Sequence, residues 1–201
     1  MREGICIWFT GLPSSGKSTL ARRLFSLLQE KGYLVKLFDG DEVREKFFPE
    51  AGFSKEARIN YLLKVAELVK KELSQNQIVI CAFVSPYREI REKLRKEIGK
   101  NRFVEVFVDC PLEVCEKRNT RGLYRLAREG KIENFTGISD PYEPPEKPEI
   151  HLRTDLLSVE ECVEKIFSYL LINKNKEEDF SKGEIKAPEK LKSSAGLDAL
   201  F

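Results

Sequence analysis

Short apolar runs alternate with helical patterns along most of the chain. Five runs have the length and composition of buried strands: Ile5–Thr10, Leu34–Asp39, Ile78–Val84, Phe103–Asp109 and Ile150–Thr154. Between them, apolar residues recur at helical spacing, as at Leu62, Val65, Ala66, Val69 and Leu73. Strands that alternate with helices predict an α/β fold, in which a parallel sheet is covered by helices on both faces.

The last helical pattern runs from Val159 to Leu170 and opens with Ser158 and Glu161 at the spacing of a capping box. Residues 172–201 follow with six basic and six acidic side chains and little apolar periodicity. That composition predicts a disordered tail or a linker. We therefore expect one folded domain over residues 1–171.

Residues 119–149 interrupt this alternation with several glycines and four prolines, and basic side chains cluster at its start. The basic side chains are Arg118, Arg121, Arg125 and Arg128. A segment of this length is too long for a simple connection in a compact domain. We expect it to form a lid over a substrate.

One octapeptide, at residues 11–18, follows the first strand directly and precedes a helix. It fits the pattern G-x-x-x-x-G-K-[ST] with Gly11, Leu12, Pro13, Ser14, Ser15, Gly16, Lys17 and Ser18. Such a loop points backbone N–H groups at phosphate oxygens, and the following helix adds the positive end of its dipole. Lys17 is expected at the β- and γ-phosphates and Ser18 on Mg²⁺, with Thr19 beside them. The motif predicts nucleoside triphosphate binding.

Composition narrows the class of protein further. The chain carries 35 basic and 33 acidic residues, so no net charge favours nucleic acid or an anionic membrane. Its five cysteines form no C-x-x-C pair, and three lie in or beside strand-like runs, which indicates reduced core thiols and a cytoplasmic protein. A strand that starts at residue 5 leaves no room for a signal peptide, and no apolar stretch is long enough to span a bilayer.

Polar residues gather where the predicted strands end. Asp39, Asp41, Ser85 and Asp109 all fall at carboxyl ends of strands, where parallel sheets bind their ligands. The N-K-x-D motif of GTPase switches does not occur in the sequence. A small chain with a P-loop and a long arginine-rich lid therefore looks like a phosphotransferase that acts on a small molecule.

A series of short motifs then resembles one family of kinases. In order, they are Asp39-Gly40-Asp41, Gly52-Phe53-Ser54, Ser85-Pro86-Tyr87-Arg88, Gly122-Leu123-Tyr124, Phe135-Thr136-Gly137 and Pro141-Tyr142-Glu143. Over about residues 3–171 the chain resembles adenylylsulfate kinase, which phosphorylates the 3′-hydroxyl of adenosine 5′-phosphosulfate with ATP. The resemblance implies Mg²⁺ with the ATP, a homodimer, and association with ATP sulfurylase as a further option.

The resemblance also implies roles for residues around the acceptor. Asp41 is the expected general base, because transfer to an alcohol needs a carboxylate that accepts the hydroxyl proton. Arg44 and Arg58 are expected on the phosphosulfate, and Phe53 and Phe135 on either side of the adenine. More ordinary roles remain open: an arginine on a solvated helix face, or Phe53 in the core.

Further site residues follow from the same motifs. Asp39 orients Mg²⁺ through water or forms a turn. The family treats Ser85 as a phosphorylated intermediate, but direct in-line transfer needs none, so a positioning role for Ser85 and Arg88 is the stronger interpretation. Pro86 and Tyr87 complete that motif as substrate-binding residues. Arg118 is expected on the adenine of ATP, and Arg121 and Arg125 on phosphates.

The chain departs from the family pattern after Gly52-Phe53-Ser54. Tyr61 stands where the family has asparagine, and Ala57, Leu63, Lys64 and Glu133 also differ. These differences bear on affinity and on substrate identity at the phosphosulfate end. Two alternatives therefore stay open: a kinase for another small hydroxyl-bearing metabolite, or a nucleotide-sensing domain of a larger sulfurylase-type assembly.

Overall fold

The computed structural model describes residues 4–75, 77–119 and 122–181, and it divides the chain into two compact units, Met1–Ile166 and Phe167–Phe201. The elements up to the lid follow in the order β1 Ile5–Thr10, α1 Lys17–Glu30, β2 Val35–Asp39, α2 Gly40–Phe47, α3 Lys55–Leu73, β3 Ile78–Ala82, α4 Arg88–Ile98 and β4 Phe103–Asp109. The remaining elements are α5 Leu112–Arg118, α6 Leu123–Arg128, β5 Ile150–Arg153 and α7 Val159–Ser181.

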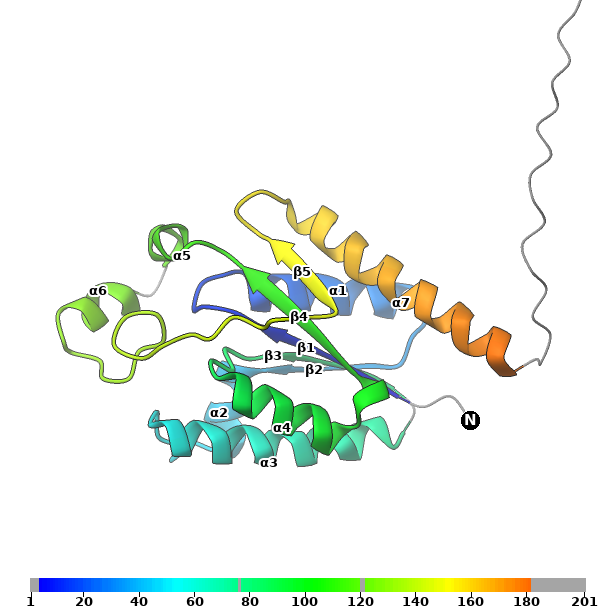
Figure 1. Cartoon of the computed structure of the whole chain (residues 1–201), viewed down its shortest axis with the longest axis horizontal. Coiled ribbons are helices and arrows are strands. Elements are labelled where there is room, and N and C mark those ends of the chain that lie inside the picture. The colour runs from blue at the N-terminus through cyan, green and yellow to red at the C-terminus, as the bar shows by residue number, and fades with distance from the viewer. Residues whose placement is uncertain (1–3, 76, 120–121, 182–201) are drawn as a thin grey trace, which may run out of the picture. The chain divides into compact units, whose positions relative to one another are not determined.

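The five strands form one parallel sheet in the order β2-β3-β1-β4-β5, with helices on both faces (Figure 1). This confirms the predicted α/β class, and each predicted strand is present. β3 ends at Ala82 rather than Val84, because the chain turns sharply at Ser85, whose φ is +45°. The central strand β1 is almost completely buried, as expected of a parallel strand covered on both faces.

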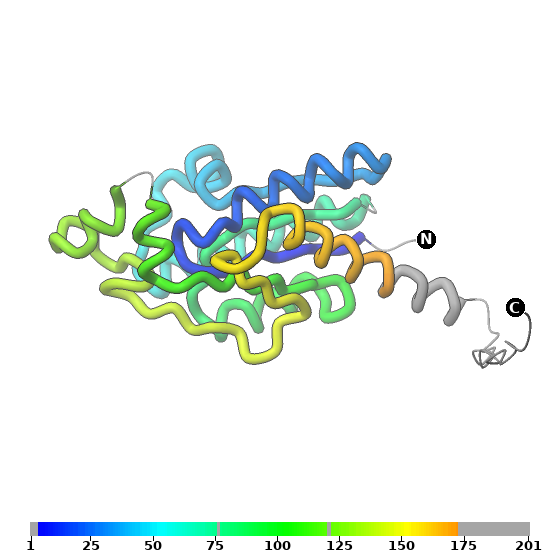
Figure 2. Tube along the Cα trace, turned by 90° about the horizontal axis from the view of Figure 1, so that it is seen from above, coloured from blue at the N-terminus to red at the C-terminus, as the bar shows by residue number. Residues whose placement is uncertain are grey.

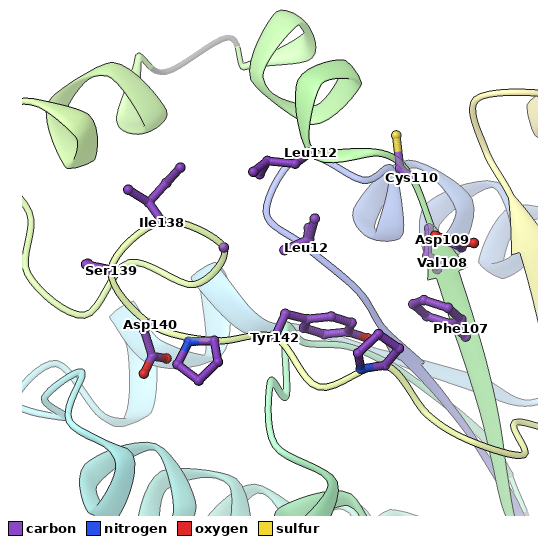
Figure 3. A pocket seen from close by; sticks show the side chains of 13 residues that line it. Leu12, Phe107, Val108, Asp109, Cys110, Leu112, Ile138, Ser139, Asp140 and Tyr142 are labelled. Carbon is purple, nitrogen blue, oxygen red and sulfur yellow. The ribbon is translucent and has the colours of Figure 1, made fainter.

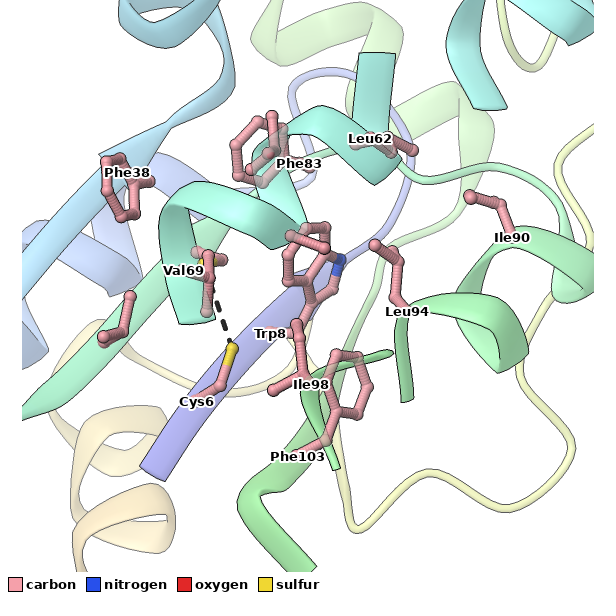
Figure 4. Packing of buried hydrophobic residues seen from close by; sticks show 14 of the residues in the cluster. Cys6, Trp8, Phe38, Leu62, Val69, Phe83, Ile90, Leu94, Ile98 and Phe103 are labelled. Carbon is pink, nitrogen blue, oxygen red and sulfur yellow. Dashed lines mark hydrogen bonds between the residues drawn. The ribbon is translucent and has the colours of Figure 1, made fainter. Parts of the chain in front are cut away.

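Trp8 lies at the centre of the larger hydrophobic core, on the face that α3 and α4 cover (Figure 4). Its ring stacks against Phe83 and Phe103, at centroid distances of 5.0 and 5.9 Å. Leu62 and Val69 of α3 and Leu94 of α4 close over these rings. Trp8 also donates a hydrogen bond to Ser85, so this core holds the turn that follows β3.

Ile7 and Phe9 alternate with Trp8 and face the other side of the sheet, where α1 lies (Figure 1). The buried face of α1 carries Leu20, Ala21, Leu24 and Leu28. All five cysteines are buried and free, as the sequence predicts for core thiols. No helix within the described ranges is long and apolar enough to cross a membrane.

The segment between α5 and β5, which is the predicted lid and keeps that name below, forms a lobe at one end of the first unit (Figure 2, green to yellow). It has a small core of its own, in which Tyr124 packs edge-on against Phe135 at 4.9 Å, next to Cys110 and Cys115. The Tyr124 hydroxyl donates a hydrogen bond to the carbonyl of Pro13, so the lobe is tied to the octapeptide loop.

Helix α7 extends past residue 171, into the segment for which the composition predicts a disordered tail or a linker. Its last residue is Ser181. The rest of the predicted tail, residues 182–201, lies outside the described residues.

Candidate active site

The octapeptide loop joins β1 to α1, as the motif predicts. Gly11 has a φ of +155°, and a Cβ there would lie 2.4 Å from the carbonyl oxygen of Val108. Gly16 has a φ of +106° and directly precedes the first turn of α1. Glycine is required at both places, because a side chain would clash at the first and strain the backbone at the second. The first turn of α1 therefore faces the loop with its free N–H groups.

Lys17 is buried within this loop. Its Nζ donates hydrogen bonds to the carbonyls of Gly11 at 3.0 Å and Leu12 at 2.6 Å. Burial lowers the pKa of Lys17 to about 8, although Asp39 and Asp41 oppose the shift. A desolvated ammonium group attracts anions strongly, since little water screens it.

A cavity of about 580 Å³ opens beside Lys17 and brings most of the predicted residues together. The predicted residues in its wall are Pro13, Ser14, Lys17, Ser18, Asp39, Asp41, Arg44, Phe53, Arg58, Ser85, Pro86 and Phe135. They come from the loop after β1, the ends of β2 and β3, the start of α3 and the lid. Residues far apart in the sequence thus share one cavity at the carboxyl edge of the sheet.

The two aspartates after β2 have different surroundings. Asp39 is buried and caps α2, because its Oδ1 accepts the backbone N–H of Asp41, and its Oδ2 accepts from Arg22 at 3.3 Å. Asp41 is exposed in the first turn of α2, and its negative charge acts to raise the pKa of Lys17. Asp39 therefore caps α2, and both Asp39 and Asp41 line the cavity.

Arg44 is held between two aromatic rings. Its Cζ lies 4.4 Å from the ring centre of Phe53 and 4.5 Å from that of Tyr61. Its Nη1 donates to the carbonyls of Ala51 and Gly52. Phe53 is 53% exposed, so it belongs to the cavity wall and not to the core.

Arg58 connects the start of α3 to the lid. It donates hydrogen bonds to the carbonyls of Phe53 and Asn134, and its Nε lies 4.0 Å from a carboxylate oxygen of Asp140. Burial lowers the pKa of Arg58, and Asp140 opposes that shift. The Arg58 side chain is therefore mostly buried, and it does not lie on a solvated helix face, which was the alternative that the sequence left open.

Two lid residues of the Phe135-Thr136-Gly137 motif line the cavity. Phe135 is only 9% exposed, because one edge of its ring packs on Tyr124. Thr136 is buried, and its Oγ1 has no hydrogen-bond partner within the described part of the chain. A buried hydroxyl without a partner is costly unless a ligand or water satisfies it.

The Ser85-Pro86-Tyr87-Arg88 motif divides between the cavity and the lid. Ser85 is buried, and its Oγ accepts a hydrogen bond of 2.9 Å from Trp8 Nε1. An indole N–H cannot accept a proton, so this contact positions Ser85 without activating it. Tyr87 and Arg88 lie outside the cavity: the Tyr87 hydroxyl donates to Asp140, and Arg88 donates to the carbonyl of Pro144.

Arg118 lies at a second opening, of about 490 Å³, on the other side of the first turn of α1. Its guanidinium donates to Thr154, and Gly16, Thr19 and Leu157 also line this opening. It therefore lies beside the first turn of α1, opposite the cavity at Lys17. Arg125 is 79% exposed at the side chain and lies outside both cavities, and Arg121 lies outside the described residues.

A further cavity, of about 600 Å³, lies between the end of β4 and the returning lid (Figure 3). Phe107 and Tyr142 stack on each other in its wall, at a centroid distance of 6.0 Å, and Leu12 of the octapeptide also lines it. Asp109 lines this cavity and pairs with His151 at 2.8 Å. Its position at a strand end therefore does not bring it to Lys17.

Some residues of the site were not predicted as binding residues. Thr136 was within a quoted motif, so its signal was present in the sequence. In the sequence Tyr61 stands out only as a departure from the family pattern, yet it lines the cavity. Arg91 gave no signal, because a lone arginine on a helix is usually solvated, but here it is 3% exposed and donates to the carbonyls of Ser85 and Glu143.

The parallel sheet, the octapeptide loop and the nearby carboxylate define a P-loop kinase. Comparison with known proteins specifies the family. The adenylylsulphate kinase family model matches residues 3–153. The chain is 49% identical to an adenylyl-sulfate kinase of Halothermothrix orenii. The match covers 84% of this chain and 90% of that protein. An adenylyl-sulfate kinase of Clostridium kluyveri is 48% identical, with 84% of each chain covered.

A solved structure agrees with these relatives. The Mycobacterium tuberculosis APS kinase CysC, in complex with AMPPNP and APS, superposes with a TM-score of 0.81 at 35% identity. The match covers 85% of this chain and 99% of that chain. The protein belongs to the adenylylsulphate kinase family, as the motifs predicted.

Proposed function

We propose that this protein transfers the γ-phosphoryl group of ATP to the 3′-hydroxyl of adenosine 5′-phosphosulfate, which forms 3′-phosphoadenosine 5′-phosphosulfate and ADP. The observation that carries the proposal is that Lys17, Asp41 and Arg44 line the same cavity. A phosphate-binding loop, a carboxylate and a fixed guanidinium are the groups that such a transfer needs. Membership of the family supports the same reaction.

On the donor side, the loop backbone and Lys17 hold the β- and γ-phosphates, and the adenosine of ATP continues toward Arg118. Lys17 exchanges its bonds to the carbonyls of Gly11 and Leu12 for bonds to phosphate oxygens. The gain is largest when negative charge moves onto the leaving oxygen, because the desolvated ammonium lies beside it.

On the acceptor side, Phe53 and Phe135 hold the adenine, while Arg44 and Arg58 bind the phosphosulfate. The 3′-hydroxyl then lies between the γ-phosphoryl group and Asp41. Asp41 accepts the hydroxyl proton as the oxygen attacks phosphorus, and the bond to ADP breaks in line. The partnerless Thr136 hydroxyl is available as a further polar contact for the acceptor.

Mg²⁺ fits this site through Ser18. The half-exposed Ser18 hydroxyl lines the cavity together with Asp39, and oxygen ligands are those that Mg²⁺ prefers. Among the described residues, no group of three or more His, Cys, Asp or Glu side chains could enclose a metal. When bound with ATP, the ion would neutralise phosphate charge, and Ser18 would contribute a ligand oxygen.

A survey of acceptors tests the proposal. ADP release is measured with adenosine 5′-phosphosulfate, AMP, a nucleoside and a sugar acid, and the rate without acceptor is subtracted. We expect adenosine 5′-phosphosulfate to be preferred over AMP by about tenfold or more, since the sulfate adds charge-assisted bonds. Equal use of AMP and adenosine 5′-phosphosulfate would favour a kinase of another small metabolite.

A further inference from the structure

Tyr61 lies on α3, and both its hydroxyl and its ring contact groups at the acceptor site. Its side chain is nearly buried, and it lines the same cavity as Asp41 and Arg44. Its ring makes edge contacts with Phe48 at 5.5 Å and Phe83 at 6.1 Å. These two contacts fix the plane of the ring, so Tyr61 is a rigid surface rather than a mobile side chain.

The hydroxyl of Tyr61 reaches the turn that carries the proposed base. It donates a hydrogen bond of 3.1 Å to the carbonyl oxygen of Gly40, the residue between Asp39 and Asp41. Burial raises the pKa of Tyr61 to about 12, so the hydroxyl keeps its proton and remains a donor at neutral pH. The hydrogen bond restrains the first turn of α2, and with it the direction of the Asp41 carboxylate.

The ring of Tyr61 supports the guanidinium of Arg44. Phe53 also contacts this guanidinium. The Arg44 Cζ lies 4.5 Å from the ring centre of Tyr61 and 4.4 Å from that of Phe53. A guanidinium held between aromatic rings keeps its N–H groups directed outward in one plane. An arginine prepared in this way loses less freedom when it binds an anion.

We infer that Tyr61 is a positioning residue of the acceptor site, which orients Asp41 through its hydroxyl and Arg44 through its ring. This inference rests on the proposed phosphotransfer. It assigns separate effects to two parts of one side chain: the hydroxyl acts on the chemical step, and the ring acts on binding of the acceptor anion.

Two substitutions separate these effects. Tyr61→Phe removes only the hydroxyl, and we expect kcat to fall about threefold to tenfold while the acceptor KM stays within about twofold. Tyr61→Leu removes the ring as well, and we expect the same fall in kcat together with an acceptor KM raised by about threefold to thirtyfold. The KM for ATP stays unchanged in both, because neither group reaches the loop at residues 11–18.

Phe48→Leu is the matched control. The Phe48 ring packs edge-on against Tyr61 and lies outside the cavity wall. Its backbone N–H donates to the carbonyl of Arg44, and the leucine substitution keeps that backbone bond while it changes the ring. We expect its kcat and acceptor KM to stay within about twofold of the wild type, even where its melting temperature falls. A loss of activity that follows melting temperature across all three variants would identify Tyr61 as a packing residue and overturn the inference.

The remaining outcomes are distinct from one another. If the wild type transfers phosphate to adenosine 5′-phosphosulfate, while Tyr61→Phe keeps its kcat and Tyr61→Leu keeps its acceptor KM, this inference fails alone. If the folded wild type binds ATP but releases no ADP in response to any acceptor, the proposed function fails and the inference fails with it.

Discussion

The donor half and the acceptor half of the site are built in different ways. One continuous stretch, residues 11–18, forms the donor half, and its own backbone bonds and the start of α1 hold it. The acceptor half comes from four separate segments, which arginine side chains join by donating to backbone carbonyls. Arg44 reaches Gly52, Arg58 reaches Asn134, and Arg91 reaches both Ser85 and Glu143.

This difference determines how each half responds to substitution. In the donor half, the loop geometry depends on glycines and on backbone groups that most side-chain changes leave intact. In the acceptor half, one arginine can fix two segments at once, so a single change releases both. We therefore expect donor variants to lose chemistry with little change in stability, and variants of the joining arginines to lose stability and acceptor binding together.

The largest expected effect concerns the donor half. Lys17→Ala should abolish turnover, because the β- and γ-phosphates lose the one lysine of the loop in both the ground state and the transition state. ADP release measures turnover, and a thermal melt checks that the fold is intact. Lys71→Ala, at an exposed position on α3, is the control. Undiminished ADP formation by Lys17→Ala would contradict the assignment of the donor half.

The proposed base comes next in size. Asp41→Asn should lower kcat by about 10²–10⁴ while both substrates still bind, since asparagine keeps the shape but cannot accept the proton. Glu42→Gln tests a neighbouring carboxylate in the same helical turn, which pairs with the exposed Arg22. A variant that binds both ligands and turns over at the wild-type rate would show that Asp41 is only a turn residue.

Arg91 tests whether the acceptor half depends on its joining arginines. Its Nε lies 2.8 Å from Glu105, and both side chains are buried. Arg91→Met should lower the free energy of unfolding by about 3–5 kcal/mol, because it leaves the Glu105 carboxylate buried beside fewer partners. It should also raise the acceptor KM, since the bond to the lid at Glu143 is lost. Urea unfolding measures the first effect and ADP release the second.

Two controls sharpen that result. Lys93→Met removes an exposed pair with Glu89 on the same helix, and we expect the free energy of unfolding to stay close to that of the wild type. The double variant Arg91→Met with Glu105→Leu should regain part of the stability, because an apolar pair of similar volume replaces the ion pair. If stability returns but the acceptor KM does not, the bond from Arg91 to Glu143 is the part that matters for the acceptor.

The same contrast explains what the sequence could and could not predict. The sheet and the donor loop are predictable because strand periodicity and the spacing of Gly11, Gly16 and Lys17 are local patterns. The arginine contacts are not predictable in this way, since every residue has a carbonyl and none is marked as the acceptor. Arg91 and Arg58 therefore look like surface arginines in sequence, and only the fold reveals which carbonyls they reach.

Tyr87 and Arg88 illustrate the same limit within a recognised motif. Their neighbours Ser85 and Pro86 line the cavity, and the motif alone gives all four the same expectation. The turn at Ser85 divides them, because the chain then enters α4 and directs Tyr87 toward Asp140 of the lid. Whether a motif residue meets the ligand or the lid depends on one backbone angle that the sequence does not display.

The smallest expected effect returns to the donor half and concerns pH. The pKa of Lys17 is lowered from 10.5 to about 8 by burial. Between these values the unfolded chain binds more protons at this lysine than the folded chain does, so its contribution to stability rises with pH. The affinity for ATP should move in the opposite direction and fall by about tenfold from about pH 7 to about pH 9, because bound phosphates need the protonated form. Equilibrium binding of a fluorescent ATP analogue measures this, with Lys17→Arg as the variant that stays protonated. A wild-type profile as flat as that of Lys17→Arg would show that Lys17 does not titrate in this range.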